Sequence, residues 1–152
     1  MLHLIARPRR IVMAAAVAAL LGCAALLSVS ATPAEAVFRK CPKGEFCLYF
    51  NEDANGGIYH FSGNDSNLGN DRYEGEDTGE TVGNTSRYVW NNGVPARRSD
   101  VVVASLPGLN GARGCIKRGA KTSLPRKWWN SIESYRWVTA AQCKKAGIIG
   151  QD

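Results

Sequence analysis

Short runs of aromatic and β-branched residues alternate with turn-forming pairs along most of the chain. The turns between the runs carry Asn-Gly or Pro-Gly pairs, such as Asn92-Gly93 and Pro107-Gly108. This pattern is typical of an all-β sandwich or barrel, and only residues 139–145 favour a helical turn. The predicted strands are residues 46–50, 58–61, 88–90, 101–104, 115–117 and 134–138.

The order of these elements occurs twice. Residues 50–63 carry a strand, an Asn-Gly turn, a second strand and a closing Gly, and residues 104–119 carry the same order. We therefore predict two related halves, about 41–94 and 95–140, within a single domain. The first half contains an additional acid-rich stretch, residues 62–82, which we expect to be a surface loop that buries little.

The N-terminal 36 residues follow a different pattern. Three arginines precede an apolar run, residues 11–27, and the segment ends in Ala34-Glu35-Ala36. This order predicts a signal peptide, residues 1–36, and a secreted, extracellular domain of residues 37–152 after cleavage at Ala36. A membrane anchor is the first alternative, but the run is at the short limit for a span. Lipidation at Cys23 is the second, and the apolar residues after Cys23 disfavour it.

Removal of residues 1–36 leaves four of the five cysteines: Cys41, Cys47, Cys115 and Cys143. An even number in a small exported domain indicates two disulfides. Three pairings are possible, and we favour Cys41 with Cys47 and Cys115 with Cys143, one bridge in each half. The longer loop should contribute more, on the order of 3 kcal/mol. A zinc site is disfavoured because there is no Cys-x-x-Cys and only one histidine remains, His60.

The formal net charge of +6 is unevenly distributed. Residues 37–94 hold five basic and nine acidic side chains, and residues 95–152 hold eleven basic and three acidic ones. A basic half can attract an anionic partner, but no basic run in either half exceeds two residues, which favours an ordinary solvated surface. Nucleic-acid binding is not expected, since the charge is not gathered on one element and no recognition module is present.

The sequence does not indicate an enzyme. A Ser or Cys nucleophile needs a base, and His60 is the only histidine of the predicted domain. We expect the His60 ring to face solvent, opposite Tyr59 and Phe61. Motifs for a serine hydrolase, a zinc peptidase or a phosphate-binding loop are missing. A carboxylate pair for glycoside hydrolysis stays open, because its members need only meet in space.

Residues 41–49, with the order Cys-Pro-x-Gly-x-x-Cys-Leu-Tyr, and the later Phe61-Ser62-Gly63 resemble the opening of the actinobacterial peptidase inhibitor family I36. The segments 109–115, 124–125 and 128–137 are similar to the second motif of that family. The resemblance implies a βγ-crystallin-like Greek-key β-sandwich with two pseudo-repeated motifs. It also implies a secreted, monomeric inhibitor whose partner is an extracellular protease of the metalloprotease class.

An inhibitor of this kind needs no catalytic residue, because a stiff loop that fills the protease cleft has little ordering left to lose on binding. The resemblance does not identify the inhibitory loop, and residues 64–82 and Asn91 to Ser99 are the two candidate segments. The alternatives are a killer-toxin-like antimicrobial protein and a cell-wall- or carbohydrate-binding module. For the latter, tryptophans could supply stacking faces, although core packing is the favoured role of Trp90, Trp128, Trp129 and Trp137.

Proteins of the βγ-crystallin type often bind calcium at a turn rich in Asn, Asp and Ser. The corresponding segments here are residues 83–88 and 129–134, in which Asn84, Asn130 and Glu133 are weak candidate ligands. Arg87 brings a positive charge into the first segment, which opposes a cation. We therefore expect no required cofactor, with calcium as the one metal to consider.

Overall fold

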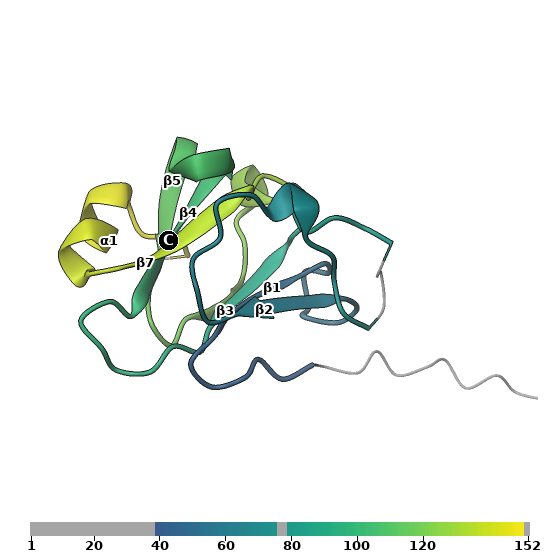
Figure 1. Ribbon diagram of the computed structural model, residues 1–152, viewed down its shortest axis with the longest axis horizontal. Helices are drawn as coiled ribbons and strands as arrows, with labels where there is room; N and C mark the ends of the chain where they lie inside the picture. Colours follow the sequence, from purple (N-terminus) through teal and green to yellow (C-terminus); the bar gives the residue numbers. More distant parts are fainter. Residues whose placement is uncertain (1–38, 76–78, 151–152) are drawn as a thin grey trace, which may run out of the picture. The chain divides into compact units, whose positions relative to one another are not determined.

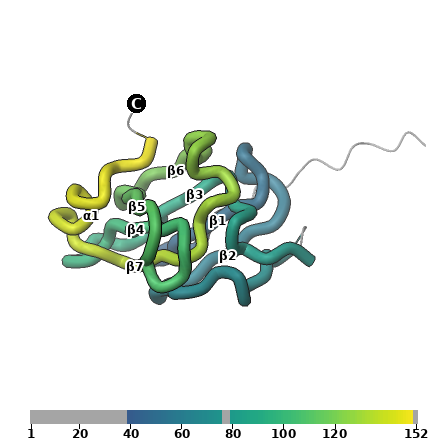
Figure 2. The backbone as a smooth tube through the Cα atoms, turned by 90° about the horizontal axis from the view of Figure 1, so that it is seen from above, coloured from purple at the N-terminus to yellow at the C-terminus, as the bar shows by residue number. Residues whose placement is uncertain are grey.

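The computed structural model describes residues 39–75 and 79–150, and the predicted signal peptide lies outside them. Seven strands form two antiparallel sheets (Figures 1 and 2). One sheet has the order β2-β1-β3-β6, and the other has the order β5-β4-β7. No helix within the described residues has the length and apolar character that a membrane span requires.

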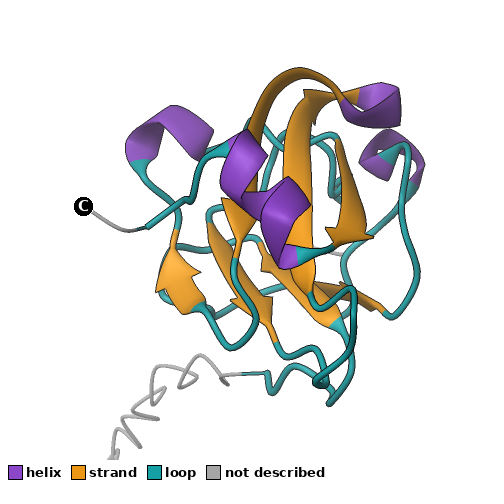
Figure 3. Ribbon diagram, turned by 90° about the vertical axis from the view of Figure 1, so that its left-hand side faces the viewer, coloured by secondary structure: helices purple, strands orange, loops and turns teal. Residues whose placement is uncertain are grey.

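The strands are short, and most coincide with the apolar runs of the sequence. Figure 3 shows them as two groups, with the helical turns outside. In chain order they are β1 (Phe46–Tyr49), β2 (Ile58–Phe61), β3 (Tyr88–Asn91), β4 (Asp100–Leu106), β5 (Asn110–Ile116), β6 (Lys121–Ser123) and β7 (Ser134–Val138). The helical elements are α1 (Ala140–Ala146) and the short 3-10 turns η1 (Leu68–Asn70), η2 (Pro107–Leu109) and η3 (Arg126–Trp128).

The main core lies between the two sheets. Phe46 and Leu48 of β1 and Val101 and Val103 of β4 are fully buried there. The ring of Phe46 lies 4.9 Å from that of Tyr135 in the opposite sheet. The alternate residues of β1 are buried on the outer face, where Cys47 and Tyr49 form a second cluster with Cys41, Ala54 and Ile58. Strand β1 is therefore apolar throughout because both of its faces are covered.

Backbone contacts relate the two halves of the fold by an approximate twofold exchange. The N–H of Asn84 donates to the carbonyl of Ile132, and the N–H of Asn130 donates to the carbonyl of Ser86. The two asparagines have the same left-handed conformation, with φ of 58° and 52°. Similarly, Leu68 donates to Glu133 and Leu124 donates to Arg87. The internal repeat seen in the sequence thus corresponds to matched contacts in space.

Asn91, at the end of β3, ties the two sheets together. Its side chain is fully buried, and its Nδ2 donates to the carbonyls of Ser99, at 3.0 Å, and Ile116, at 3.1 Å. Its Oδ1 accepts from the N–H of Gly93 at 3.0 Å. The buried amide therefore has its donors and acceptor paired across β3, the β3–β4 linker (residues 92–99) and β5, as a buried polar group requires.

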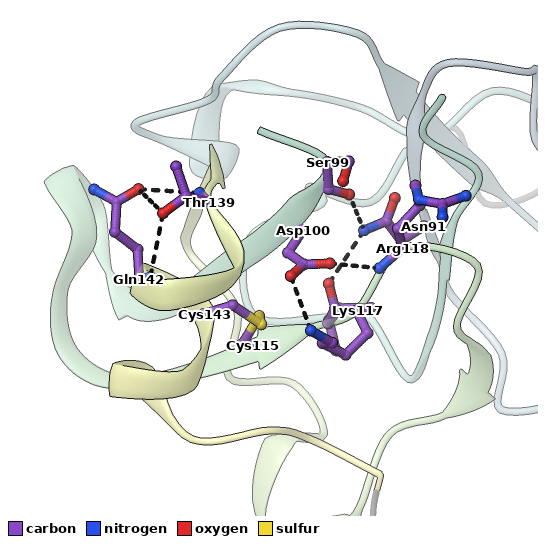
Figure 4. Close-up of polar contacts among 10 residues, drawn as sticks. Asn91, Ser99, Asp100, Cys115, Lys117, Arg118, Thr139, Gln142 and Cys143 are labelled. Atoms are coloured by element: carbon purple, nitrogen blue, oxygen red, sulfur yellow. Dashed lines mark hydrogen bonds and ion pairs between the residues drawn. A yellow bond between two sulfur atoms is a disulfide. The ribbon is translucent and has the colours of Figure 1, made fainter. Parts of the chain in front are cut away.

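The C-terminal segment packs against sheet β5-β4-β7. Thr139 caps α1 through a capping box with Gln142, as Figure 4 shows. Beyond the helix, Cys115 of β5 donates to the carbonyl of Gly147, and Ile149 donates back to the carbonyl of Cys115. The Ile149 side chain enters the main core. The tail thus adds a short parallel bridge to the outer edge of β5.

The acid-rich stretch 62–82 differs from the prediction. We expected a surface loop that buries little, yet Leu68, Tyr73 and Val82 are almost completely buried in the main core. The hydroxyl of Tyr73 also contacts that of Ser86 at 2.9 Å. The prediction was wrong because three widely spaced apolar residues anchor the segment, while Glu74 and Glu80 between them remain exposed.

The structure pairs Cys41 with Cys47 and Cys115 with Cys143, the pairing favoured from the sequence. The first bridge closes a separation of 6 residues and the second closes a separation of 28 residues. All four cysteines are fully buried. The two bridges thus fasten the N-terminal loop to β1 and α1 to β5.

The two bridges should stabilise the protein unequally, because a disulfide that closes a longer loop removes more entropy from the unfolded chain. We expect the double substitution Cys115→Ser/Cys143→Ser to cost about 3.5 kcal/mol and Cys41→Ser/Cys47→Ser to cost about 2 kcal/mol. Urea denaturation of the two variants beside the parent protein measures both costs. An equal or reversed order would show that native packing around the sulfurs, and not loop length, sets the contribution.

Candidate functional site

The β4–β5 loop, residues 105–111, comprises the end of β4, the turn η2 and the start of β5, and it presents an apolar side chain to solvent. Leu106 is 52% exposed, which is the largest value among the exposed large hydrophobic residues of the described chain. Its backbone is extended, with φ of −137° and ψ of 159°, and Pro107 follows directly. An exposed, extended leucine at the end of a hairpin is the form in which a peptide side chain can enter an enzyme cleft.

Hydrogen bonds hold both sides of this connection. The buried hydroxyl of Ser134 donates to the carbonyl of Leu106 at 2.7 Å and accepts from the N–H of Leu109 at 3.0 Å. The N–H of Gly108 donates to the carbonyl of Ser66 at 2.8 Å. The ring of Pro107 fixes one further backbone angle. The loop is therefore ordered before any partner arrives.

Gly111 closes the same loop and has a structural reason to be glycine. Its φ is +74°, and a Cβ at this position would lie 2.4 Å from the hydroxyl oxygen of Ser105. That hydroxyl accepts from the N–H of Ala112 at 2.9 Å. The sequence pattern predicted a turn at Pro107-Gly108 and an Asn-Gly turn within residues 104–119, but it did not predict a binding loop there. No local pattern in the sequence indicated that Leu106 would be exposed.

The two segments that the sequence offered as inhibitory loops have different characters. Residues 64–82 are anchored in the core, as described above. In the β3–β4 linker, Val94 is 44% exposed, and residues 94–98 are all exposed. The linker is fixed at its start by Asn91, whereas its tip has no hydrogen bond comparable to those of Ser134 in the β4–β5 loop among the contacts of the described residues.

Two aspartates of the acid-rich segment, Asp65 and Asp71, lie close together. Asp65 accepts a hydrogen bond from the hydroxyl of Tyr59 at 2.5 Å. Asp71 has one buried carboxyl oxygen without a hydrogen-bond partner. Burial, followed by the negative charge of Asp65, raises the pKa of Asp71. Burial also raises the pKa values of Tyr59 and Tyr135, which border the pair. Folding therefore makes the carboxylate form of Asp71 less favourable than it is in an ordinary aspartate.

His60 belongs to a cluster of charged groups at the outer face of β2. Its Nδ1 contacts Glu45 at 2.5 Å and its Nε2 lies 3.4 Å from Glu74. The His60 side chain is 27% exposed, so the ring is partly covered and partly in contact with solvent. Both ring nitrogens contact carboxylates, so within the described residues the ring is not paired with a hydroxyl or thiol nucleophile.

The structure brings together two of the three weak calcium candidates. The amide of Asn84 donates to a carboxyl oxygen of Glu133, and Asn130 occupies the equivalent turn of the other half. The guanidinium of Arg87 lies 5.6 Å from the ring centres of both Phe50 and Trp129. A hard cation requires several oxygen ligands, so the Asn84–Glu133 pair by itself is a partial set. The expectation that no cofactor is required, with calcium as the one metal to consider, stays a prediction.

Only one group of three acidic, histidine or cysteine side chains in the described ranges is close enough to share a metal ion. It consists of Asp100, Cys115 and Cys143. Both sulfurs are joined in a disulfide, and Asp100 binds Lys117 and the backbone of Arg118 (Figure 4). This group is therefore a structural contact.

Residues 34–96 match the model of peptidase inhibitor family I36. The match spans β1, β2 and β3 and ends within the β3–β4 linker. It associates this part of the chain with protease inhibitors that are not enzymes, in agreement with the sequence analysis. A search of curated protein sequences finds no significant match.

Solved structures with a similar fold are βγ-crystallin domains. One, from work on the evolution of the eye-lens βγ-crystallin fold, has 18% identity and a TM-score of 0.51, and the alignment covers 66% of this chain and 92% of that one. A βγ-crystallin from an archaeon has 13% identity and a TM-score of 0.45, with 64% and 100% covered. The N-terminal domain of Protein S has 19% identity and a TM-score of 0.44, with 63% and 97% covered. The predicted crystallin-like all-β fold is confirmed.

Substitution Asp71→Asn should stabilise the protein at neutral pH. The raised pKa of Asp71 means that the folded state holds its proton more strongly than the unfolded state, so the parent protein loses stability as the pH rises above the ordinary aspartate range. An asparagine avoids that loss and can donate to Asp65, a gain of about 1 kcal/mol.

Urea denaturation at pH 7 and at pH 3 measures this difference. The free energies of unfolding of the parent and the variant should become equal at the lower pH, where the Asp71 carboxyl of the parent is protonated in both the folded and the unfolded state. Glu52→Gln, a change at an exposed carboxyl, serves as the control and should alter stability little at either pH. A variant that is less stable than the parent at pH 7 would contradict the assignment.

Proposed function

We propose that the chain is a secreted inhibitor of metalloproteases and that the β4–β5 loop enters the protease cleft. The match of residues 34–96 to peptidase inhibitor family I36 is the observation that carries the proposal. Secretion agrees with the signal-peptide pattern of residues 1–36 and with two disulfides, which form in oxidising compartments. The metalloprotease class comes from the family resemblance.

The β4–β5 loop supports the loop-insertion mechanism physically. Protein association loses affinity when flexible segments must become ordered, and this loop is already held by Ser134 and Ser66. Leu106 offers an apolar side chain for a subsite of the protease, and the bond that follows it is an imide to Pro107. The loop lies outside the residues matched by the family model, at the end of the β4–β5 hairpin (Figure 1).

The proposal is tested by titration of a protease at fixed concentration with the oxidised, exported protein. Thermolysin represents the metalloproteases and subtilisin the serine proteases. We expect activity of the metalloprotease to fall linearly to an equivalence point, while subtilisin is unaffected. The absence of inhibition of both proteases would overturn the proposed function and leave the fold unchanged.

The loop assignment predicts that Leu106→Ala weakens inhibition by about tenfold or more, because burial of a leucine side chain at an interface contributes about 1.5–3 kcal/mol. Val94→Ala is the matched control, since Val94 is a similarly exposed apolar residue on the β3–β4 linker. The inhibition constants of both variants are measured with the same substrate. A large loss for Val94→Ala and none for Leu106→Ala would place the inhibitory contact on the linker instead.

A further inference from the structure

We propose that a groove between the Cys41–Cys47 loop and the β3–β4 linker binds an anionic polysaccharide. The groove has a volume of about 610 Å³ and lies beside the linker that enters β4 at Asp100. The candidate inhibitory loop, which includes Leu106, lies at the other end of β4. The two sites are thus separated by the length of β4. The binding proposed here is additional to protease inhibition and does not depend on it.

Positive charge surrounds this groove. Lys40, Lys43 and Arg118 line it, and all three side chains are exposed. Within the described part of the chain, none of the three forms an ion pair with a carboxylate, and none of the groove's lining residues is acidic. The cations come from two segments that are far apart in the sequence and meet only in the fold. Their combined field favours a ligand with several negative charges.

An aromatic surface accompanies the charge. Trp90 lines the groove and is partly exposed, and the Nζ of Lys121 lies 4.5 Å from the centre of its ring. Pro42 and Pro95 add two further apolar surfaces. An indole next to several cations suits a sugar acid, whose ring has an apolar face and whose carboxylate is charged.

The groove is held open by the covalent and hydrogen-bonded framework around it. The Nδ2 of Asn92 donates to the carbonyl of Cys41 at 2.9 Å, and the N–H of Gly44 donates to the carbonyl of Asn92 at 2.9 Å. On the other side, the N–H of Arg118 donates to Asp100 at 2.8 Å (Figure 4). A ligand therefore meets walls that are already in place, which lowers the entropic cost of binding.

The strand order favours a polysaccharide over an acidic peptide. Trp90 lies in β3, which pairs with β1 through Cys47 and with β6 through Lys121. Its backbone is thus within the sheet, and no free strand edge is offered at this position for a peptide to extend. The groove presents side chains, and it is side chains that contact the rings and carboxylates of a charged glycan.

Calorimetric titration with oligogalacturonate, a polymer of uronic acids, tests the proposal at low ionic strength. We expect saturable binding that weakens as salt is added, together with no detectable binding of neutral dextran. Polyglutamate of the same charge, which lacks sugar rings, should bind at least about fivefold more weakly. Equal or tighter binding of polyglutamate, or no binding of oligogalacturonate, would overturn the proposal.

Two pairs of substitutions distinguish binding in the groove from a general effect of the protein's net charge. Lys43→Ala/Arg118→Ala should weaken oligogalacturonate binding by about tenfold or more. Lys144→Ala/Lys145→Ala removes the same charge from exposed positions on α1 and should change affinity by less than about twofold. Trp90→Leu, checked for folding by circular dichroism, should also weaken binding. Equal losses for the two double variants would overturn the groove assignment.

Protease titration of the same variants provides an independent readout. The groove residues lie away from the β4–β5 loop, so inhibition by Lys43→Ala/Arg118→Ala should equal that of the parent. If the parent protein inhibits no protease, the proposed function fails, and the glycan titration still tests the groove on its own. Loss of glycan binding in the groove variants, with intact inhibition, supports two separate sites on one domain.

Discussion

The buried amide of Asn91 is the contact on which the arrangement of the two sheets depends. A single side chain joins the end of β3 to the linker that follows it and to β5 of the opposite sheet. Its backbone pairs with Gly119 and Ala120, at the turn that leads into β6. Because a polar group inside a sandwich must have its hydrogen bonds satisfied, this one residue fixes how the chain leaves the first half and enters the second.

This constraint also positions both proposed sites. The linker that Asn91 holds forms one wall of the cationic groove, and the strand that begins where the linker ends leads directly to Leu106. The same packing requires a glycine at position 93, because a Cβ there would lie 2.7 Å from the ring of Trp137 and 2.9 Å from the Asn91 oxygen. The small sandwich thus presents the candidate loop at one end of β4 and the cationic groove at the other.

Local patterns in the sequence predicted most of the fold, and the parts they missed depend on distant contacts. Apolar runs located β1, β2, β3 and β7, and the helical turn predicted at residues 139–145 corresponds to α1. Strand β6 was missed because Lys121-Thr122-Ser123 is polar and becomes a strand only by pairing with β3. The burial of Tyr73 was hidden among acidic neighbours.

The candidate sites show the same limit. The sequence provided the cysteine pairing and the weak calcium candidates, of which Asn84 and Glu133 do meet. It did not provide the groove, because Lys40 and Arg118 belong to opposite halves of the chain and no local spacing relates them. The sequence did not predict the exposure of Leu106 either, because a leucine in a strand is usually buried.

The short tail that follows α1 has a protective role in addition to its contribution to the core. By bonding to Cys115 on both sides, residues 147–149 occupy backbone groups at the edge of β5 that would otherwise be open to another strand. The same tail leads Ile149 into the interior, where it lies against Gly114. The edge of β5 is therefore closed to strand addition at this position, which disfavours edge-to-edge association of two copies of the chain through β5.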